Sequence, residues 1–492
     1  MSWGIALNAL LILTVIFSIG AFRQRRFIDE QHLLRGYLLA GNTLQKYRVI
    51  NLLWSTSFSL NGMLYQVWLG YIVGMWGLLP QAVWAASFFW LAKYAQTVRE
   101  NDSLHGALGK SFQSSTRVIA GLFSIIGAMA LIGWEVNVGK TTFEGLLIGS
   151  GGLAPSQLAL LLSLAIVFSC VIYTIIGGLR GNAIADSLQS ILKMIGFCGL
   201  IVLFVLNVRG HSIGGWHSAF PSFATVVAQI GIFGLITNLA FSIVWQFIDM
   251  SAWQTVISGA KGRSEAESKS DLRWGGVWVF IAPGIVGTVL GILLKTASDV
   301  TADNVLARSL AVLPPLGPVV TLLLGLALIS CILGMVDGLL VASGYALIVD
   351  IFEPGKTLDD LDATPQRAKS LMTRVRVAFF LLALVGSFGV TKFMALLGLS
   401  VFDILYLVII PHLSLTGPVF ASLVGRTAGK IPMWFAMFIA VSIGLIAVVG
   451  GTRLNYEWAV TGAGIFTITA SVVCAFLFSK TNKSNLHMAD HA

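Results

Sequence analysis

Charged residues are scarce in this sequence. Asp, Glu, Lys and Arg together make up 11% of the 492 residues, against roughly 25% in an ordinary soluble domain. Because 56% of the residues are hydrophobic, the chain cannot cover a folded surface of its size with polar groups. The composition therefore excludes a soluble globular protein and predicts an all-α chain embedded in the lipid bilayer.

Cysteine is equally rare. The four cysteines lie far apart in apolar segments, show no CxxC spacing and are interpreted as small buried hydrophobic residues. No catalytic constellation can be assembled from the remaining polar residues. We therefore predict no cofactor, no metal site and no enzymatic activity.

Long apolar runs are what the sequence has in quantity. About 20 apolar residues cross a bilayer as a helix, so the runs predict thirteen transmembrane helices. The first lacks the basic start and cleavage site of a signal peptide and is expected to be retained. The predicted spans are 2–22, 48–75, 78–97, 117–145, 156–177, 184–208, 223–257, 274–295, 315–350, 372–392, 396–424, 431–451 and 457–479.

The net charge of +9 could indicate a nucleic-acid partner, but its distribution argues against one. If the N-terminus is outside, 24 of the 31 Lys and Arg residues fall on the inner side and 6 on the outer side. This asymmetry follows the positive-inside rule. It predicts a multi-pass protein of the plasma (bacterial inner) membrane, with the N-terminus outside, the C-terminus cytoplasmic and no nucleic-acid partner.

Two of the predicted spans interrupt their own hydrophobicity. The second contains the polar run "STSFSLNG" at 55–62, and the seventh contains several amides and an acid between 237 and 259. Matched polar breaks in two halves of a chain indicate a transporter binding site, whereas the alternative is polar contacts between packed helices. The candidates for contacting a small polar solute are Ser59, Gly62, Gln66, Trp68, Asn238, Trp245, Gln246 and Asp249.

Three stretches resemble the sodium–solute symporter family. "YTIIGGLRGNAIADSLQSILKMIG" at 173–196 carries the family's Gly-Gly-Leu turn, then an Asp, a Gln three residues later and a Gly. "DMSAWQTVISGAKGRSEA" at 249–266 is similar to the segment after the family's broken seventh span, with Thr255 where Arg is common. "GLLVASGYALIVDIFEP" at 338–354 resembles the end of span nine. On this order and spacing, the chain is identified as a divergent member.

The resemblance implies a LeuT-like architecture within one transmembrane domain, 1–492. It consists of an extra N-terminal helix and loop (1–47), two inverted five-helix repeats (48–208 and 223–424), two C-terminal helices (431–479) and a cytoplasmic tail (480–492). It also implies alternating access, with the substrate held between the broken helices.

The family's sodium site is altered in this sequence. In the family, two hydroxyl residues of span nine bind sodium together with backbone carbonyls of the first broken helix. The matching positions are Gly334 and Met335 for the hydroxyls, and Ser55 and Phe58 for the carbonyls, while Asp337 matches a later family Asp. A thioether is a poor ligand for a hard cation. We therefore expect a degraded sodium site.

Lys193 lies in the middle of the sixth span, seven residues after Asp186 and on the same helix face. An intramembrane lysine indicates function by default, so we hypothesise that its ammonium occupies the vacated sodium site. The alternatives are an ion pair with Asp186 or Asp337, and a side chain that extends to the inner surface.

The sequence thus predicts a secondary active transporter that imports a small polar solute, with protons more probable than sodium as the coupling cation, or with sodium-independent transport. Two alternatives stay open. One is a sodium-coupled symporter with a different ion site built from Asp186 or Asp337, and the other is a transporter-like solute sensor that acts through a separate signalling partner.

Overall fold

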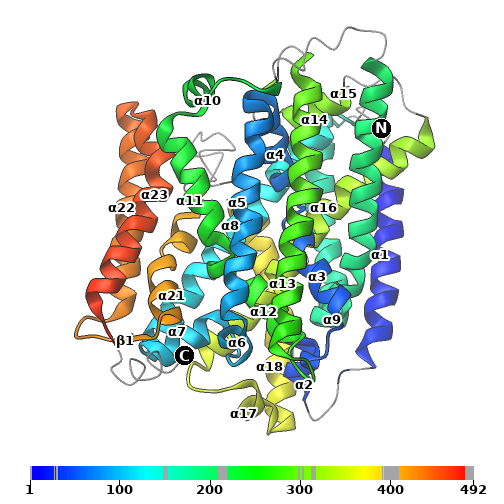
Figure 1. Ribbon diagram of the computed structural model, residues 1–492. Coiled ribbons are helices and arrows are strands. Elements are labelled where there is room, and N and C mark those ends of the chain that lie inside the picture. Colours follow the sequence, from blue (N-terminus) through cyan, green and yellow to red (C-terminus); the bar gives the residue numbers. More distant parts are fainter. Residues whose placement is uncertain are drawn as a thin grey trace.

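Long apolar helices form most of the protein, shown in Figure 1 as a computed structural model. Within the described residues, nine helices are long and apolar enough to cross a membrane, or ten if the bent pair Phe223–Ile230 and Ile232–Ile248 forms one span. The chain is therefore an all-α polytopic membrane protein. The structure describes residues 3–26, 28, 32–147, 153–208, 219–296, 300–301, 304–311, 317–390, 392 and 409–481.

The N-terminal half alternates long helices with short helical connections. At one end of the bundle lie the short helices α2, α6 and α7, as Figure 1 shows. The elements are α1 (Trp3–Arg25), α2 (Leu33–Leu38), η1 (Ala40–Asn42), α3 (Lys46–Ser55), α4 (Leu60–Val73), η2 (Gly74–Gly77), α5 (Leu78–Leu91), η3 (Ala92–Tyr94), α6 (Ala95–Arg99), α7 (Leu104–Ser111), α8 (Ser114–Glu144) and α9 (Pro155–Val208).

The C-terminal half packs against these helices and adds a short strand pair. Strands β1 and β2 are antiparallel, with Arg426 opposite Thr481. The elements are α10 (Phe223–Ile230), α11 (Ile232–Ile248), α12 (Met250–Ser258), α13 (Glu265–Val279), η5 (Phe280–Val286), α14 (Gly287–Leu293), η6 (Leu294–Thr296), α15 (Val305–Ala311), α16 (Pro318–Tyr345), η7 (Ala346–Phe352), α17 (Leu358–Asp362), α18 (Pro365–Leu384), η8 (Val385–Val390), α21 (Thr416–Leu423), β1 (Arg426–Ala428), α22 (Met433–Leu454), α23 (Glu457–Phe478) and β2 (Ser479–Thr481).

Two pairs of predicted spans are joined directly at a glycine of positive φ, Gly74 in the first pair and Gly178 in the second. Leu60–Arg99 joins the second and third spans, and Pro155–Leu206 joins the fifth and sixth. The second run is kinked at Gly178, where φ is 54°. A Cβ there would lie 2.3 Å from the Tyr37 carbonyl oxygen, so only glycine fits this turn. The predicted span 396–424 lies partly outside the described residues, and its last part contains α21.

Close packing of α4 on α14 depends on glycine. A Cβ at Gly70 would lie 2.4 Å from the Thr288 carbonyl oxygen, and one at Gly291 would lie 2.1 Å from that of Val67. Small residues let membrane helices approach closely where no hydrophobic force drives them together. This contact holds the helix after the first polar break against the bundle.

Asp350, in the stretch that resembles the end of span nine, fixes η7 to α7 and α8. Its buried carboxylate accepts hydrogen bonds from Ser103 Oγ and Arg117 Nε, both at 2.8 Å. His105 lies between this carboxylate and Ser124, with 2.8 Å from Nδ1 to Asp350 and 2.8 Å from Nε2 to Ser124 Oγ. Because a buried charge needs such partners, the network explains an acid at this position.

Candidate functional site

The first polar break separates α3 from α4. Helix α3 ends at Ser55, and α4 begins at Leu60 with Ser59 as its N-cap, whose side chain accepts a hydrogen bond from the Gly62 amide at 3.1 Å. Ser side chains favour this position because they satisfy a free amide at the helix start. The polar run therefore interrupts the helix within the bundle, as the sequence predicts.

The second polar break lies at Asp249. Its φ of −76° and ψ of 105° are extended and separate α11 from α12. The carboxylate caps α12 by accepting hydrogen bonds from the Ser251 amide at 2.8 Å and from Ser251 Oγ at 2.6 Å. Both predicted broken helices are therefore present.

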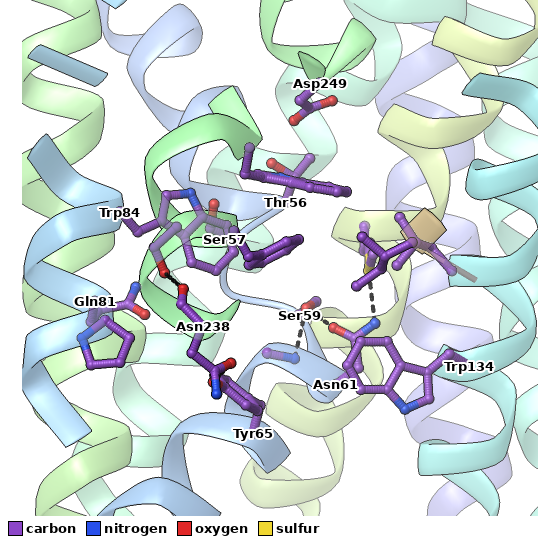
Figure 2. Close-up of a pocket in the computed structure, with 18 of the residues that line it drawn as sticks. Thr56, Ser57, Ser59, Asn61, Tyr65, Gln81, Trp84, Trp134, Asn238 and Asp249 are labelled. Carbon is purple, nitrogen blue, oxygen red and sulfur yellow. Dashed lines mark hydrogen bonds between the residues drawn. The ribbon is translucent and has the colours of Figure 1, made fainter. Parts of the chain in front are cut away.

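A cavity of about 100 Å³ lies between the two breaks. Figure 2 shows Asp249 at one end of it and Tyr65 at the other. Its volume is well below the roughly 300–1,000 Å³ typical of ligand pockets, which restricts an occupant to a small molecule. The lining combines hydroxyls and amides with aromatic rings: Thr56, Ser57, Ser59, Asn61, Gln81, Thr237, Asn238, Ser242 and Ser251 with Tyr65, Trp84, Trp134, Phe241 and Trp245.

Five of the eight residues proposed to contact a solute line this cavity. They are Ser59, Gly62, Asn238, Trp245 and Asp249. Asn238 accepts a hydrogen bond from the Tyr65 hydroxyl, and its amide donates to the Gly234 carbonyl at 2.9 Å. These residues come from α4, α11 and the second break, so the structure brings the two polar segments together.

The other three residues are not among those that line the cavity. Gln66 donates from Nε2 to the Gly77 carbonyl at 2.8 Å and to Thr288 Oγ1 at 2.6 Å, which ties α4 to η2 and α14. Trp68 stacks on Tyr71 with ring centroids 5.6 Å apart. Gln246 is buried on α11. None of the three lines this cavity, and their contact with a solute stays a prediction.

Lys193 lies beside the first break. Its side chain is fully buried, and Nζ donates to the Ser55 carbonyl at 3.0 Å and to Ser55 Oγ at 2.9 Å. Within the described residues it forms no ion pair with Asp186 or Asp337. The structure therefore places the ammonium at the predicted Ser55 carbonyl, and neither a direct ion pair nor an extension to the surface describes it.

The two acids lie one contact further away. Ser55 Oγ donates to Asp186 Oδ1 at 2.6 Å, so that hydroxyl connects the ammonium to the carboxylate. Asp337 accepts from the Tyr173 hydroxyl at 2.9 Å and is fully buried, like Asp186. One oxygen of each carboxylate is buried without a hydrogen-bond partner among the described residues. The cluster thus has one lysine, two acids and unused acceptor oxygens.

Glycine at 334 makes room for the ammonium. A Cβ there would lie 2.6 Å from Lys193 Nζ, 2.7 Å from Gln189 Oε1 and 2.7 Å from Ser55 Oγ. Any side chain at this position would therefore displace the lysine. Both hydrogen bonds of Nζ go to Ser55, and the Phe58 ring packs on Phe197 at 5.5 Å.

The lysine cluster and the cavity share the same structural elements. Ser55 contacts Lys193, whereas the next residue, Thr56, lines the cavity. On α16, Gly334 faces the lysine and Met335 lines the cavity, where its sulfur accepts from Asn61 Nδ2 at 3.4 Å. A movement of the lysine side chain can therefore alter the cavity through two adjacent residue pairs, Ser55 with Thr56 and Gly334 with Met335.

Glu135 is a site residue whose position differs from the sequence interpretation. An acid in the fourth span could be interpreted as part of an entry path or as a solvated helix end, but its side chain is fully buried. Its carboxylate accepts from the Leu60 amide at 3.0 Å and the Asn61 amide at 3.1 Å. It therefore holds the start of α4, where the positive end of the helix dipole favours an anion.

Of the aromatic lining, the sequence predicted Trp245 and missed Tyr65, Trp84, Trp134 and Phe241. Trp84 and Phe241 lie with ring centroids 6.1 Å apart, and Phe241 and Trp245 lie 5.0 Å apart. The chain has 14 Trp and 30 Phe residues, so aromatic residues alone do not single out a cavity. His412, buried beside Trp245 at 5.5 Å between ring centroids, extends this aromatic group.

Metal ligands do not cluster in the part of the chain that the structure describes: no group of three His, Cys, Asp or Glu residues there is arranged to hold a metal ion. The described cysteines are free. The chemistry that this site offers consists of hydrogen bonding, aromatic contact and charge.

Comparison with solved structures identifies the same fold. A sodium-coupled sialic acid symporter, in a substrate-bound outward-open state, superposes with a TM-score of 0.71 at 14% identity, over 97% of this chain and 99% of that one. At this identity the likeness establishes the fold alone. A manganese transporter of Eremococcus coleocola matches with a TM-score of 0.42 at 15% identity, over 90% and 95% of the chains. No protein-family model and no curated protein sequence matches the chain.

Proposed function

We propose that this chain is a secondary active transporter that imports a small polar solute by alternating access, as a divergent relative of the sodium–solute symporters. Its two inverted repeats would be 48–208 and 223–424, and it would lie in the plasma membrane with the N-terminus outside and the C-terminus cytoplasmic. The shared fold supports a membrane transporter, and the cavity between two broken helices supplies a place for the solute.

One observation carries the proposal for coupling: the buried ammonium of Lys193 contacts the break at Ser55. This is where the resemblance expects the driving sodium ion. Oxygen atoms that would coordinate sodium instead accept hydrogen bonds from Nζ, and a fixed positive charge repels a second cation in a medium of low dielectric constant. The lysine thus substitutes for the mobile ion.

A proton can complete the charge balance of this cluster. Lys193 contributes one positive charge, and Asp186 and Asp337 contribute two negative charges when both are ionised. All three side chains are fully buried, and an uncompensated buried charge is costly. With both acids ionised the net charge of the cluster is −1, and one proton on either acid brings it to zero, which makes this cluster the proposed site of proton coupling.

The proposed coupling predicts uptake without sodium. In vesicles that contain the purified protein, an inward proton gradient should drive accumulation of the transported solute when potassium replaces all sodium. Collapse of the gradient with a protonophore should abolish the accumulation above equilibrium. Strict dependence on sodium would contradict the lysine mechanism, and a lack of any accumulation across a broad solute panel would favour the sensor alternative.

A sodium-coupled alternative rests on a specific observation. Asp186 Oδ2, Gln189 Oε1 and Asp337 Oδ1 are buried acceptors without a hydrogen-bond partner among the described residues. Oxygen atoms of this kind suit a hard cation. If sodium proves necessary, removal of the Asp186 or Asp337 carboxylate should weaken the sodium response, whereas removal of the lysine should leave it in place.

The charge of the cavity restricts the solute. Asp249 is the one ionisable acid or base among the described lining residues, beside the aromatic rings of Trp84, Phe241 and Trp245. A carboxylate and aromatic faces attract cations and disfavour anions. We therefore propose a neutral or positively charged solute, in contrast to a carboxylate.

An Asp249→Asn variant tests this charge preference. Because Asn caps a helix about as well as Asp, the start of α12 should be preserved. For a positively charged solute the KM should rise by roughly tenfold, equal to about 1.4 kcal/mol, while uptake of a neutral analogue should change little. An equal loss for both solutes would indicate a structural role for the carboxylate, and an Asp360→Asn variant on α17 serves as the matched control.

A further inference from the structure

A second cavity, of about 570 Å³, lies apart from the first and shares no lining residue with it. Its walls come from α2, the end of α6, the link between α12 and α13, and α17, elements that Figure 1 places toward one end of the bundle. The charged side chains that line it include Arg35, Arg99, Arg180, Lys261, Glu100 and Asp359. Four basic groups thus face two acids.

The positive charge of this cavity is only partly compensated. Arg35 pairs with Asp359, with Nε 2.9 Å from Oδ1, and more weakly with Asp102 at 3.6 Å. By contrast, neither Arg99 nor Lys261 forms an ion pair with a residue in the described ranges. Arg35 is therefore neutralised by its acidic partners, whereas Arg99 and Lys261 leave the lining of this cavity with excess positive charge.

Arg99 is held in place at the wall of the cavity. It donates from one terminal nitrogen to the carbonyls of Ala260, at 3.2 Å, and Arg263. A guanidinium anchored in this way has lost much of its side-chain entropy before a ligand arrives, which favours binding.

We propose that this cavity binds a phosphate-bearing anion, with Arg99, Arg180 and Lys261 as its counter-charges. Arginine forks match the oxygens of phosphate, and lysine adds a point charge. The volume falls within the range of metabolite pockets, so a soluble phosphorylated compound fits, and so does the headgroup of an anionic phospholipid. The two sources share this chemistry.

Occupancy would join segments that are far apart in sequence. Arg180, on α9, donates to the Ala40 carbonyl at 2.8 Å, and the Lys261 amide donates to the Asn42 carbonyl at 2.9 Å. Between them, Ala40, Gly41 and Asn42 have φ of 50°, 65° and 60°. Left-handed backbone is unfavourable for the two residues of this turn that are not glycine. An anion that bridges Arg180 and Lys261 would stabilise this turn together with its neighbours.

The test uses the purified full chain and defined probes. Binding of inorganic pyrophosphate and of ATP is measured by calorimetry, in nanodiscs of phosphatidylcholine and in nanodiscs with phosphatidylglycerol. A soluble ligand is indicated by binding in both lipids. A lipid headgroup is indicated if phosphatidylglycerol raises the unfolding temperature and competes with pyrophosphate. Failure of all probes to bind or stabilise the protein would overturn the proposal.

Two charge-reversal variants make the test specific to the cavity. Lys261 and Arg273 are both exposed, so neither substitution should prevent folding, and of the two only Lys261 lines the cavity. Lys261→Glu should weaken the affinity at least tenfold, with a weaker dependence on salt, whereas Arg273→Glu should leave it within twofold. Equal affinity in the Lys261→Glu variant would refute the site even if the wild-type protein binds phosphate.

Discussion

Coupled uptake by a Lys193→Met variant is expected to fall to the background of empty vesicles, at least about 100-fold below the wild-type rate, equal to about 2.7 kcal/mol. Methionine fills the buried volume of the lysine stem without supplying a charge. The variant removes both hydrogen bonds to Ser55 and the cation that faces Asp186 through the Ser55 hydroxyl. Nothing then holds a positive charge at the break.

The matched control replaces a lysine near the end of α8. Lys140 is half-buried, and Lys140→Met should retain near wild-type uptake. Thermal unfolding of each purified variant separates loss of transport from loss of folding. Unchanged, gradient-driven uptake by a well-folded Lys193→Met protein would refute the role of the ammonium.

A reconstruction tests the same mechanism in the opposite direction. Replacing Lys193 by Ala removes the ammonium, and Gly334→Ser with Met335→Ser restores hydroxyls beside the Ser55 carbonyl. A Cβ at Gly334 would lie 2.6 Å from Nζ, so removal of the lysine relieves the closest of its contacts, while the side-chain ends of Gln189 and Ser55, each at 2.7 Å, must still move. The triple variant is therefore expected to show uptake that rises with sodium, measured against the Lys193→Ala single variant.

Much of the fold could be predicted from the scarcity of charge and the long apolar runs. In a membrane such runs form helices, because the backbone groups must satisfy their hydrogen bonds within the chain. Apart from 396–424, which lies partly outside the described residues, the expected spans follow the observed helices in order. The boundaries were harder to predict. The run through Gly178 stays helical on both sides of its turn, and its conformation depends on the approach of the Tyr37 carbonyl. A contact between residues so far apart in sequence leaves no local pattern.

The lysine cluster was predictable because an ammonium in an apolar span stands out from its surroundings. Its contact with Ser55 follows from the resemblance and is present. Both hydrogen bonds of Nζ go to Ser55, and a contact with the Phe58 carbonyl stays a prediction. The assignment of Gln66 to the solute stays a prediction, because an amide in a transmembrane helix can satisfy a backbone carbonyl, here that of Gly77, as readily as a solute.

Apart from Trp245, the aromatic walls could not be predicted from the sequence. Trp84 and Trp134 occupy apolar helices in which rings that face lipid, packed helices or a cavity have the same sequence pattern. The position of a ring around its helix decides which of these three environments it faces. That environment depends on which helices pack beside it in the fold. The polar breaks were easier to identify because hydroxyls and amides are costly in lipid and must find partners.

Substitution of Glu135 is expected to give the second large effect, a loss of both stability and uptake. A Glu135→Ala variant should be less stable by about 3 kcal/mol, because the amides of Leu60 and Asn61 lose a charged acceptor and remain buried. The midpoint of thermal unfolding should fall by roughly 3 °C, with loss of uptake, since α4 begins at these amides and its first turn lines the cavity.

Comparison of two substitutions at Glu135 separates charge from hydrogen bonding. Glu135→Gln keeps one acceptor oxygen but removes the anion that faces the positive end of α4, so we expect an intermediate loss of about 1–2 kcal/mol. Glu144→Ala, at the exposed end of the same helix, should be neutral. If Glu135→Ala were as stable and active as wild type, the start of α4 would not depend on this carboxylate. If Glu135→Gln lost uptake while keeping its stability, the charge itself would take part in transport beside Lys193.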